Sequence, residues 1–201
     1  MARVERRALL ALGLAAPAAA QAVPDWVGLL RGGGQVLYMR HAITDRTQVD
    51  TGRLGERAGQ RNLSAAGIAQ AQALSAAMAH LRIPLRPVRS SPVFRASDTA
   101  AIMARGAPVD VTMDLVADDY TKDVPAAIAS LRRALATPPA PGANTLLVGH
   151  IHKFGPAVFG RMLGQAEFPE GAFGVVEPAP PGFRFLRVLM PQDVVAAAAQ
   201  T

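Results

Sequence analysis

Short hydrophobic runs alternate with amphipathic segments along most of the chain. Residues 35–41, QVLYMRH, form a run typical of a strand buried on both faces of a sheet. Over residues 64–82, apolar side chains recur at steps of three and four from Ile68 to Leu81. This spacing predicts an amphipathic helix, and Ser64 is placed to cap its start. Strand followed by helix is the pattern of α/β proteins.

The same alternation continues to residue 163. Ser91 is placed to cap a helix that runs to Met103, with Pro92 at its first position, where proline is tolerated. Further strands are predicted at residues 87–91, 109–113 and 145–150, and further helices at residues 124–136 and 153–163.

The end of the chain has a different pattern. Residues 173–178 and 183–189 flank the turn-forming segment PAPPG, which predicts an antiparallel hairpin. The last residues, 194–201, are Ala-rich, and we expect them to fray. The whole pattern predicts a three-layer α/β/α fold whose central sheet is mostly parallel, with the antiparallel hairpin at its C-terminal edge.

Residues 1–22 have the pattern of a secretory signal peptide. They begin with basic residues, continue with an apolar run over residues 8–20 and end in A-x-A at Ala22. The run is shorter than the roughly 20 residues that a membrane-spanning helix needs. We therefore expect a cleaved signal over residues 1–22, one domain over residues 23–201, and a periplasmic or secreted protein without a stable membrane anchor. Sec and twin-arginine export, and the oligomeric state, stay open.

Composition narrows the chemistry. The 201 residues fit one compact domain, and the absence of cysteine excludes disulfides, thiolate metal sites and a cysteine nucleophile. Lys and Arg number 21 against 15 Asp and Glu, and every cation except Lys122 and Lys153 is arginine. The net charge of +6 and this use of arginine favour an anionic ligand. Clustered basic and aromatic residues typical of nucleic-acid binding are lacking, so we do not expect nucleic acid as a partner.

Basic side chains collect where the predicted strands end. The first strand ends in Arg40 and His41, a later strand ends in His150, and Arg95 lies one turn into a helix that follows a strand. The carboxyl ends of parallel strands meet at one rim, where ligands bind. Arginine offers paired donors to phosphate oxygens and a neutral imidazole is a competent nucleophile, so this combination indicates phosphoryl transfer.

Four motifs in this order resemble the histidine phosphatase superfamily, the phosphoglycerate mutase-like group. The first has Ala42 where the family's Arg-His-Gly has glycine. The motifs are YMRHAIT at residues 38–44, LSAAGIAQAQAL at 63–74, SSPVFRASDTA at 90–100 and LLVGH at 146–150. Several motifs in the correct order on predicted strand ends are far more specific than any one of them.

The resemblance implies a role for each motif residue. His41 would attack phosphorus and carry the phosphoryl group, while Arg40, Arg95 and His150 would surround the phosphate. Thr44 would either touch the substrate or cap its loop. The family implies neither a metal nor any other cofactor.

The proton donor is where the chain departs from the family. Many relatives carry Glu in a Leu-x-Glu setting after the third strand, whereas this chain has Ala117. We expect Asp118 to be the proton donor, slightly in preference to Asp119, which would then contact the substrate. A solvated Asp-Asp turn is the structural alternative.

These residues predict a phosphomonoester hydrolase that works through a phosphohistidine on His41, with a small phosphorylated substrate or a phosphoprotein as its partner. The alternative is a catalytically impaired relative that binds a phosphorylated ligand without turnover, suggested by Ala42 and the missing Glu. A mutase is disfavoured by the short chain and the export signal. Four loop arginines either grip the rest of an anionic substrate or are surface charge: Arg46, Arg53, Arg57 and Arg61.

Overall fold

A computed structural model describes residues 24–201, so the predicted signal peptide over residues 1–22 lies outside the described residues. The helices are α1 (Asp25–Gly32), α2 (Ala65–His80), α3 (Phe94–Ala104), α4 (Val124–Leu135), α5 (Ile151–Phe159) and α6 (Pro191–Ala199). The strands are β1 (Val36–Arg40), β2 (Leu85–Ser90), β3 (Val109–Val111), β4 (Asn144–Gly149), β5 (Phe173–Ala179) and β6 (Gly182–Leu189). Short 3₁₀ turns lie at Arg57–Gly59, Met113–Leu115 and Asp118–Tyr120.

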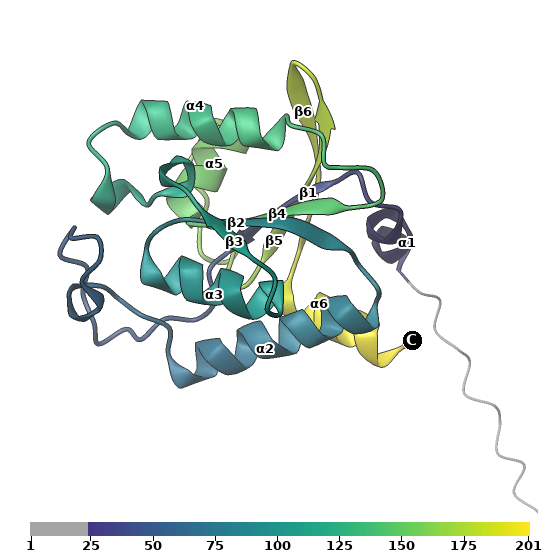
Figure 1. The fold of residues 1–201 in the computed structure, drawn as a ribbon, viewed down its shortest axis with the longest axis horizontal. Helices are drawn as coiled ribbons and strands as arrows, with labels where there is room; N and C mark the ends of the chain where they lie inside the picture. Colours follow the sequence, from purple (N-terminus) through teal and green to yellow (C-terminus); the bar gives the residue numbers. More distant parts are fainter. Residues whose placement is uncertain (1–23) are drawn as a thin grey trace, which may run out of the picture.

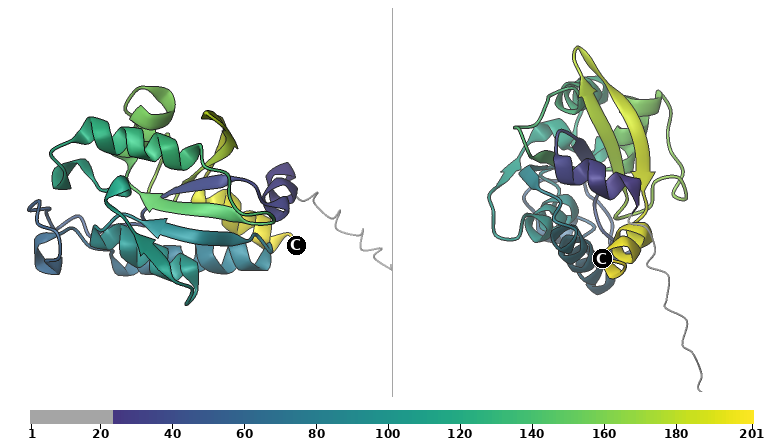
Figure 2. Two further views of the ribbon diagram at one scale, coloured as in Figure 1. Left: turned by 45° about the horizontal axis from the view of Figure 1, so that its top comes forward. Right: turned by 90° about the vertical axis from the view of Figure 1, so that its right-hand side faces the viewer.

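The six strands form one sheet in the order β3-β2-β4-β1-β5-β6. β1, β4, β2 and β3 are mutually parallel along this order, whereas β5 pairs antiparallel with β1 and β6 antiparallel with β5. Figure 2 shows the β5–β6 hairpin along one edge of the sheet. The predicted fold, a mostly parallel sheet with an antiparallel C-terminal edge hairpin, is confirmed.

Helices cover both faces of the sheet, with α2, α3 and α6 on one side and α4 and α5 on the other (Figure 1). Alternate residues of β1 face the two layers of helices. Leu37 and Met39 pack with the first set of helices, and Val36 and Tyr38 pack with the second. All five residues of β1 are buried, which is why its sequence is continuously hydrophobic.

The two ends of the described chain differ from prediction. The expectation that residues 194–201 fray is wrong, because α6 buries Val194 and Ala197 against the core that also contains Leu74 of α2. The sequence reading also missed α1, whose Trp26 and Val27 are buried in the same core. An apolar stripe that finds a partner surface orders a terminal segment. No helix within residues 24–201 is long and apolar enough to cross a membrane.

Near the carboxyl ends of the strands, several element boundaries also differ from the predicted ones. The prediction that Ser91 caps α3 with Pro92 at its first position is wrong, since the helix starts at Phe94. The Ser91 hydroxyl instead accepts a hydrogen bond from the backbone N–H of Val93, at 3.2 Å. The segment 145–163 differs in the same way, because α5 begins directly after β4 at Ile151 and ends before Gly160, whose φ is 67°.

Candidate active site

His41 follows β1 directly and is 3% exposed. Its backbone N–H donates to the carbonyl of Gly149, the last residue of β4, at 3.0 Å. Its ring Nδ1 lies 2.9 Å from the carbonyl oxygen of Ala42. Because a carbonyl only accepts, Nδ1 carries the hydrogen and Nε2 is left with the free lone pair.

The electrostatic surroundings keep this imidazole neutral. Burial lowers the pKa of His41 well below 6.5, and the positive charges of Arg95 and Arg40 lower it further. A buried ring next to cations loses its proton at neutral pH. At neutral pH the ring therefore presents an unprotonated Nε2, oriented by the hydrogen bond of Nδ1 to the backbone, which is the form that a nucleophilic histidine needs.

His150 follows β4 and faces His41, with the ring centroids 5.4 Å apart. Tyr38 fixes its backbone, since the Tyr38 hydroxyl accepts from the His150 N–H at 2.7 Å and donates to the His150 carbonyl at 3.0 Å. A Cβ on Gly149 would collide with that hydroxyl, so the glycine of the LLVGH motif is required by packing. Burial lowers the pKa of His150 well below 6.5, and neighbouring positive charges such as that of Arg95 lower it further.

Arg40, the last residue of β1, is held rigidly. Its Nη1 donates to the side-chain Oε1 of Gln165 at 2.6 Å and to the carbonyl of Phe168 at 2.8 Å. Burial lowers the pKa of Arg40 to about 10, so the guanidinium keeps its charge at neutral pH. A cation fixed in this way can stabilise a developing negative charge without first reorganising.

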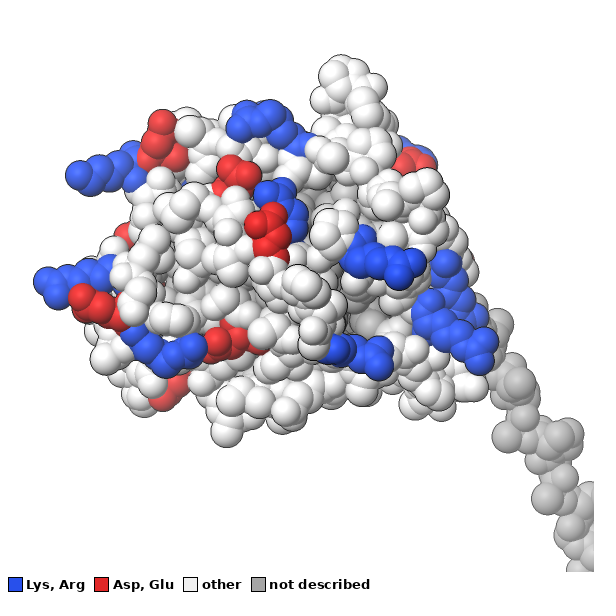
Figure 3. Space-filling view, in the orientation of Figure 1, with Lys and Arg blue, Asp and Glu red and all other residues white. Residues whose placement is uncertain are grey.

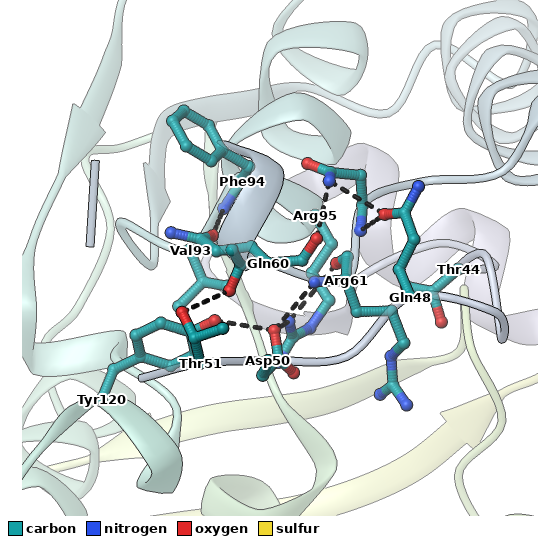
Figure 4. A network of polar contacts seen from close by, with 12 residues as sticks. Thr44, Gln48, Asp50, Thr51, Gln60, Arg61, Val93, Phe94, Arg95 and Tyr120 are labelled. Atoms are coloured by element: carbon teal, nitrogen blue, oxygen red, sulfur yellow. Dashed lines mark hydrogen bonds and ion pairs between the residues drawn. The ribbon is translucent and has the colours of Figure 1, made fainter. Parts of the chain in front are cut away.

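Arg95 lies in the first turn of α3 and is fixed by Asp50 from the long loop over residues 41–63. Its Nη1 lies 2.9 Å from Asp50 Oδ1, which also accepts from the Tyr120 hydroxyl at 2.7 Å and from the backbone N–H of Arg61 at 2.9 Å (Figure 4). Burial alone would raise the pKa of Asp50, but the hydrogen bonds from Tyr120 and Arg61 and the charge of Arg95 lower it overall. Sequence reasoning missed Asp50, because no motif marks it.

A cavity of about 180 Å³ opens between these side chains. The Nε atoms of Arg40, Arg61 and Arg95 are buried and have no hydrogen-bond partner among residues 24–201. Buried N–H groups without an acceptor are costly, and an anion in the cavity would supply acceptors. The residues lining the cavity are Arg40, His41, Arg46, Arg61, Arg95, Ala117, Asp118, Asp119, His150, Ile151, His152 and Gln165.

Both candidate carboxylates line this cavity. Asp118 and Asp119 open the 3₁₀ turn Asp118–Tyr120, and Asp118 Oδ1 lies 2.7 Å from the Nζ of Lys153, a fully buried residue of α5. Sequence reasoning missed Lys153, although a lysine on the buried face of a helix was a usable signal. Within residues 24–201, no three His, Cys, Asp or Glu side chains gather in a way that could hold a metal ion.

The structure places Thr44 outside the set of residues that line the cavity. Its hydroxyl donates to Glu170 Oε1 at 2.8 Å, and Glu170 also pairs with Arg46 at 3.1 Å. Through Glu170, Thr44 therefore stabilises the loop over residues 41–63. Ala42 is fully buried and its φ is not positive, so the loop does not need the family's glycine at this position.

The four loop arginines divide into two pairs. Arg46 and Arg61 line the cavity. Arg53 pairs with Glu56 at 3.7 Å and Arg57 pairs with Asp98 at 2.6 Å, and neither lines the cavity. Basic and acidic side chains are accordingly interspersed at the left-hand end of the molecule in Figure 3. Arg46, which also pairs with Glu170, and Arg61 are therefore placed to contact a ligand in the cavity, whereas Arg53 and Arg57 pair with carboxylates away from it.

Comparison with known proteins supports the family resemblance. Residues 36–119 match the model of the histidine phosphatase superfamily (branch 1). The matched range contains Arg40, His41 and Arg95 and ends at Asp119, and the resemblance predicted from the four motifs is confirmed. No curated protein matches the chain.

Solved structures share the fold over most of the chain. The protein histidine phosphatase SixA complexed with tungstate is 18% identical, with a TM-score of 0.58 over 80% of this chain and 99% of that one. An Agrobacterium tumefaciens structure named for the phosphohistidine phosphatase SixA is 23% identical, with a TM-score of 0.52 over 79% and 99%. The alpha-ribazole phosphatase from Shigella flexneri is 15% identical, with a TM-score of 0.56 over 78% and 96%. At these identities the likeness establishes the fold.

Proposed function

Since residues 36–119 match the model of the histidine phosphatase superfamily (branch 1), we propose that the chain is a phosphomonoester hydrolase acting through a phosphohistidine on His41. One observation carries the proposal. A neutral His41 with its Nε2 lone pair free lies in a cavity shared with three arginines, Arg40, Arg61 and Arg95, whose buried Nε atoms lack partners within residues 24–201. This arrangement combines a nucleophile with cationic donors for the phosphate oxygens.

The first step transfers the phosphoryl group to the protein. His41 Nε2 attacks phosphorus, and the bond to the ester oxygen breaks with its electron pair leaving on that oxygen. Arg40, Arg95 and His150 contact the equatorial oxygens, where negative charge is spread in the transition state. Because contacts within the protein hold both arginines, little reorganisation accompanies the step.

The second step hydrolyses the phosphohistidine and regenerates free His41. Water attacks phosphorus, the bond to Nε2 breaks, and a carboxylate must take a proton from the water. Asp118 is the proposed acid–base group because it lines the cavity beside His41 and His150, and Asp119 at the exposed rim would contact the rest of the substrate.

The substrate is a small phosphorylated compound or a phosphoprotein. The similar folds named above belong to phosphatases, which supports hydrolysis over a mutase reaction. We further propose that the substrate lies in the periplasm or outside the cell, a proposal supported by the signal-like pattern of residues 1–22.

The experiment compares the purified protein with His41→Ala on p-nitrophenyl phosphate in the presence of a chelator. We expect metal-independent hydrolysis that falls at least about 10⁴-fold in the variant, because the nucleophile is removed. His80→Ala, at an exposed position of α2, should match the unaltered protein. Phosphate binding without hydrolysis would instead identify a binding protein that has lost turnover.

A further inference from the structure

Ser91 is fully buried beside the cavity, and the proposed mechanism does not use its hydroxyl. It follows β2 directly and belongs to the motif SSPVFRASDTA. Its Oγ lies 2.9 Å from the ring Nε2 of His150 and accepts from the backbone N–H of Val93 at 3.2 Å. Turning the imidazole over would put Cε1 in the place of Nε2 and lose this hydrogen bond. The hydroxyl therefore fixes the orientation of the His150 ring.

The hydrogen of this hydroxyl also fixes the tautomer of the ring. Among residues 24–201, the hydrogen-bond partners of Ser91 Oγ are the Val93 N–H and His150 Nε2. The Val93 N–H is a donor, so Nε2 is the atom that can accept the hydroxyl hydrogen. If Nε2 carried a hydrogen of its own, the buried O–H would be left without an acceptor, which is costly. Ser91 thus favours the tautomer of His150 with a lone pair on Nε2 and the hydrogen on Nδ1.

His41 has the opposite arrangement. Its Nδ1 donates to the carbonyl of Ala42 at 2.9 Å, which leaves the lone pair on Nε2. In His150, Nδ1 has no hydrogen-bond partner within the described part of the chain, and both rings line the cavity. Burial lowers the pKa of both imidazoles well below 6.5, so both are neutral at pH 7. One ring therefore has a lone pair free for a ligand, and the other has an N–H free.

We propose that Ser91 is a positioning residue that holds His150 in the tautomer opposite to that of His41, so that neutral His150 donates its Nδ1–H to the phosphoryl group while His41 Nε2 attacks phosphorus. This inference rests on the proposed phosphohistidine mechanism. A neutral imidazole can stabilise a negatively charged oxygen as a hydrogen-bond donor, and the hydrogen stays on Nδ1 throughout the step. In the other tautomer a lone pair on Nδ1 would face the phosphoryl oxygen and repel it.

The direct test is the tautomer of His150 in the unaltered protein, measured by ¹⁵N NMR of histidine-labelled protein at pH 7, with and without inorganic phosphate. The His150 signals are assigned by their loss in His150→Gln. We expect Nδ1 of His150 to carry the hydrogen and Nε2 to carry none, and His41 also to carry its hydrogen on Nδ1, with the hydrogen bonded to Ala42. A hydrogen on Nε2 of His150, in the other tautomer or in an imidazolium, overturns the inference.

This measurement needs no turnover, so it separates the inference from the proposed function. If p-nitrophenyl phosphate is not hydrolysed, the proposed function fails, and the tautomer of His150 is still measured. If the ester is hydrolysed and His150 has its hydrogen on Nε2, the proposed function stands and the role of Ser91 is wrong.

Ser91→Ala removes the hydroxyl and leaves both tautomers of His150 available. We expect kcat for p-nitrophenyl phosphate to fall about 10-fold with little change in KM, which is less than the about 10²–10³-fold cost of losing a transition-state donor completely. Hydrogen should also appear on Nε2 in the NMR spectrum. Ser90→Ala is the matched control, because Ser90 is equally buried and its hydroxyl donates to the Ser91 carbonyl, at 2.9 Å, and not to His150. An unchanged tautomer and kcat in Ser91→Ala would contradict the inference.

A second background decides whether Ser91 acts through His150. In His150→Asn the side-chain amide supplies an N–H donor in place of Nδ1–H, and there is no tautomer to select. Adding Ser91→Ala to this variant should leave kcat close to that of His150→Asn alone, because two residues that act as a unit are not additive. A further loss of about 10-fold would show that Ser91 acts by another route, such as the packing of β2, and would overturn the inference.

Discussion

The cavity has two parts that are built differently. Its floor is formed by Arg40, His41, Arg95 and His150, each 3% exposed. Its wall is formed by Arg46, Arg61, Asp118 and Asp119, none of them fully buried. The floor residues come from strand ends and the first turn of a helix, whereas the wall residues come from connecting segments. The packed sheet therefore fixes the groups proposed to react, and the loops present the groups proposed to choose the substrate.

The two parts also differ in how their charges are held. Gln165 and Phe168 fix Arg40, and Asp50 fixes Arg95. Arg46 is 65% exposed and has Glu170 as its partner. Preorganised charges act most strongly on the transition state, whereas mobile charges act mainly on binding. Substitutions in the floor should lower kcat, and substitutions in the wall should raise KM.

The largest effect is expected in the floor. Arg95→Ala should lower kcat about 10²–10³-fold, because it removes a fixed donor from the equatorial oxygens. Steady-state kinetics with p-nitrophenyl phosphate measure the effect. Arg57→Ala is the matched control, since its guanidinium pairs with Asp98 and does not line the cavity. If Arg95→Ala raised KM and left kcat unchanged, the proposed distinction between floor and wall would be wrong.

A smaller effect is expected at Arg61. Arg61→Ala should lower kcat/KM about 10- to 100-fold, the value of one charge-assisted hydrogen bond, with most of the change in KM. The same assay separates KM from kcat. Arg53→Ala, an exposed arginine of the same loop, should have no effect. If kcat falls as far as in Arg95→Ala, Arg61 acts on the transition state and belongs with the floor.

The third expected effect is on stability and not on catalysis, and it is a pH dependence that comes from the floor imidazoles. Burial lowers the pKa of both His41 and His150 well below 6.5, so below pH 6.5 the unfolded chain binds protons that the folded protein does not. The free energy of unfolding should therefore fall as pH drops from 6.5 towards the folded pKa values, by up to about 1.4 kcal/mol per pH unit for each group. Urea unfolding at pH 7, 6 and 5 measures the slope. His41→Gln should make it shallower, and His80→Ala should not.

The sequence predicted the floor because each of its residues sits in a local pattern. Arg40, His41 and His150 end hydrophobic runs, and parallel strands bring such ends to one rim. The position of Arg95 at the rim was predicted from the start of its helix after a strand, even though the predicted cap at Ser91 was wrong. The hydrophobic run and the motif spacing depend on neighbouring residues, so one sequence is enough to find them.

The supporting residues could not be found in this way. Asp50 meets Arg95 across 45 positions of sequence, through a loop without periodicity, so nothing local marks the contact. Lys153 meets Asp118 only because α5 starts two residues earlier than predicted and packs beside the turn Asp118–Tyr120. The ordered end α6 depends on a packing partner, α2, far away in the sequence. Long-range packing decides such features.

The measurement that tests the central claim most directly is the intact mass of the protein after rapid acid-free quenching of its reaction with p-nitrophenyl phosphate. The account predicts a transient phosphoryl adduct on the unaltered protein, mapped by fragmentation to His41, and no adduct on His41→Ala. Hydrolysis at the full rate without an adduct, or an adduct on another residue, would contradict it.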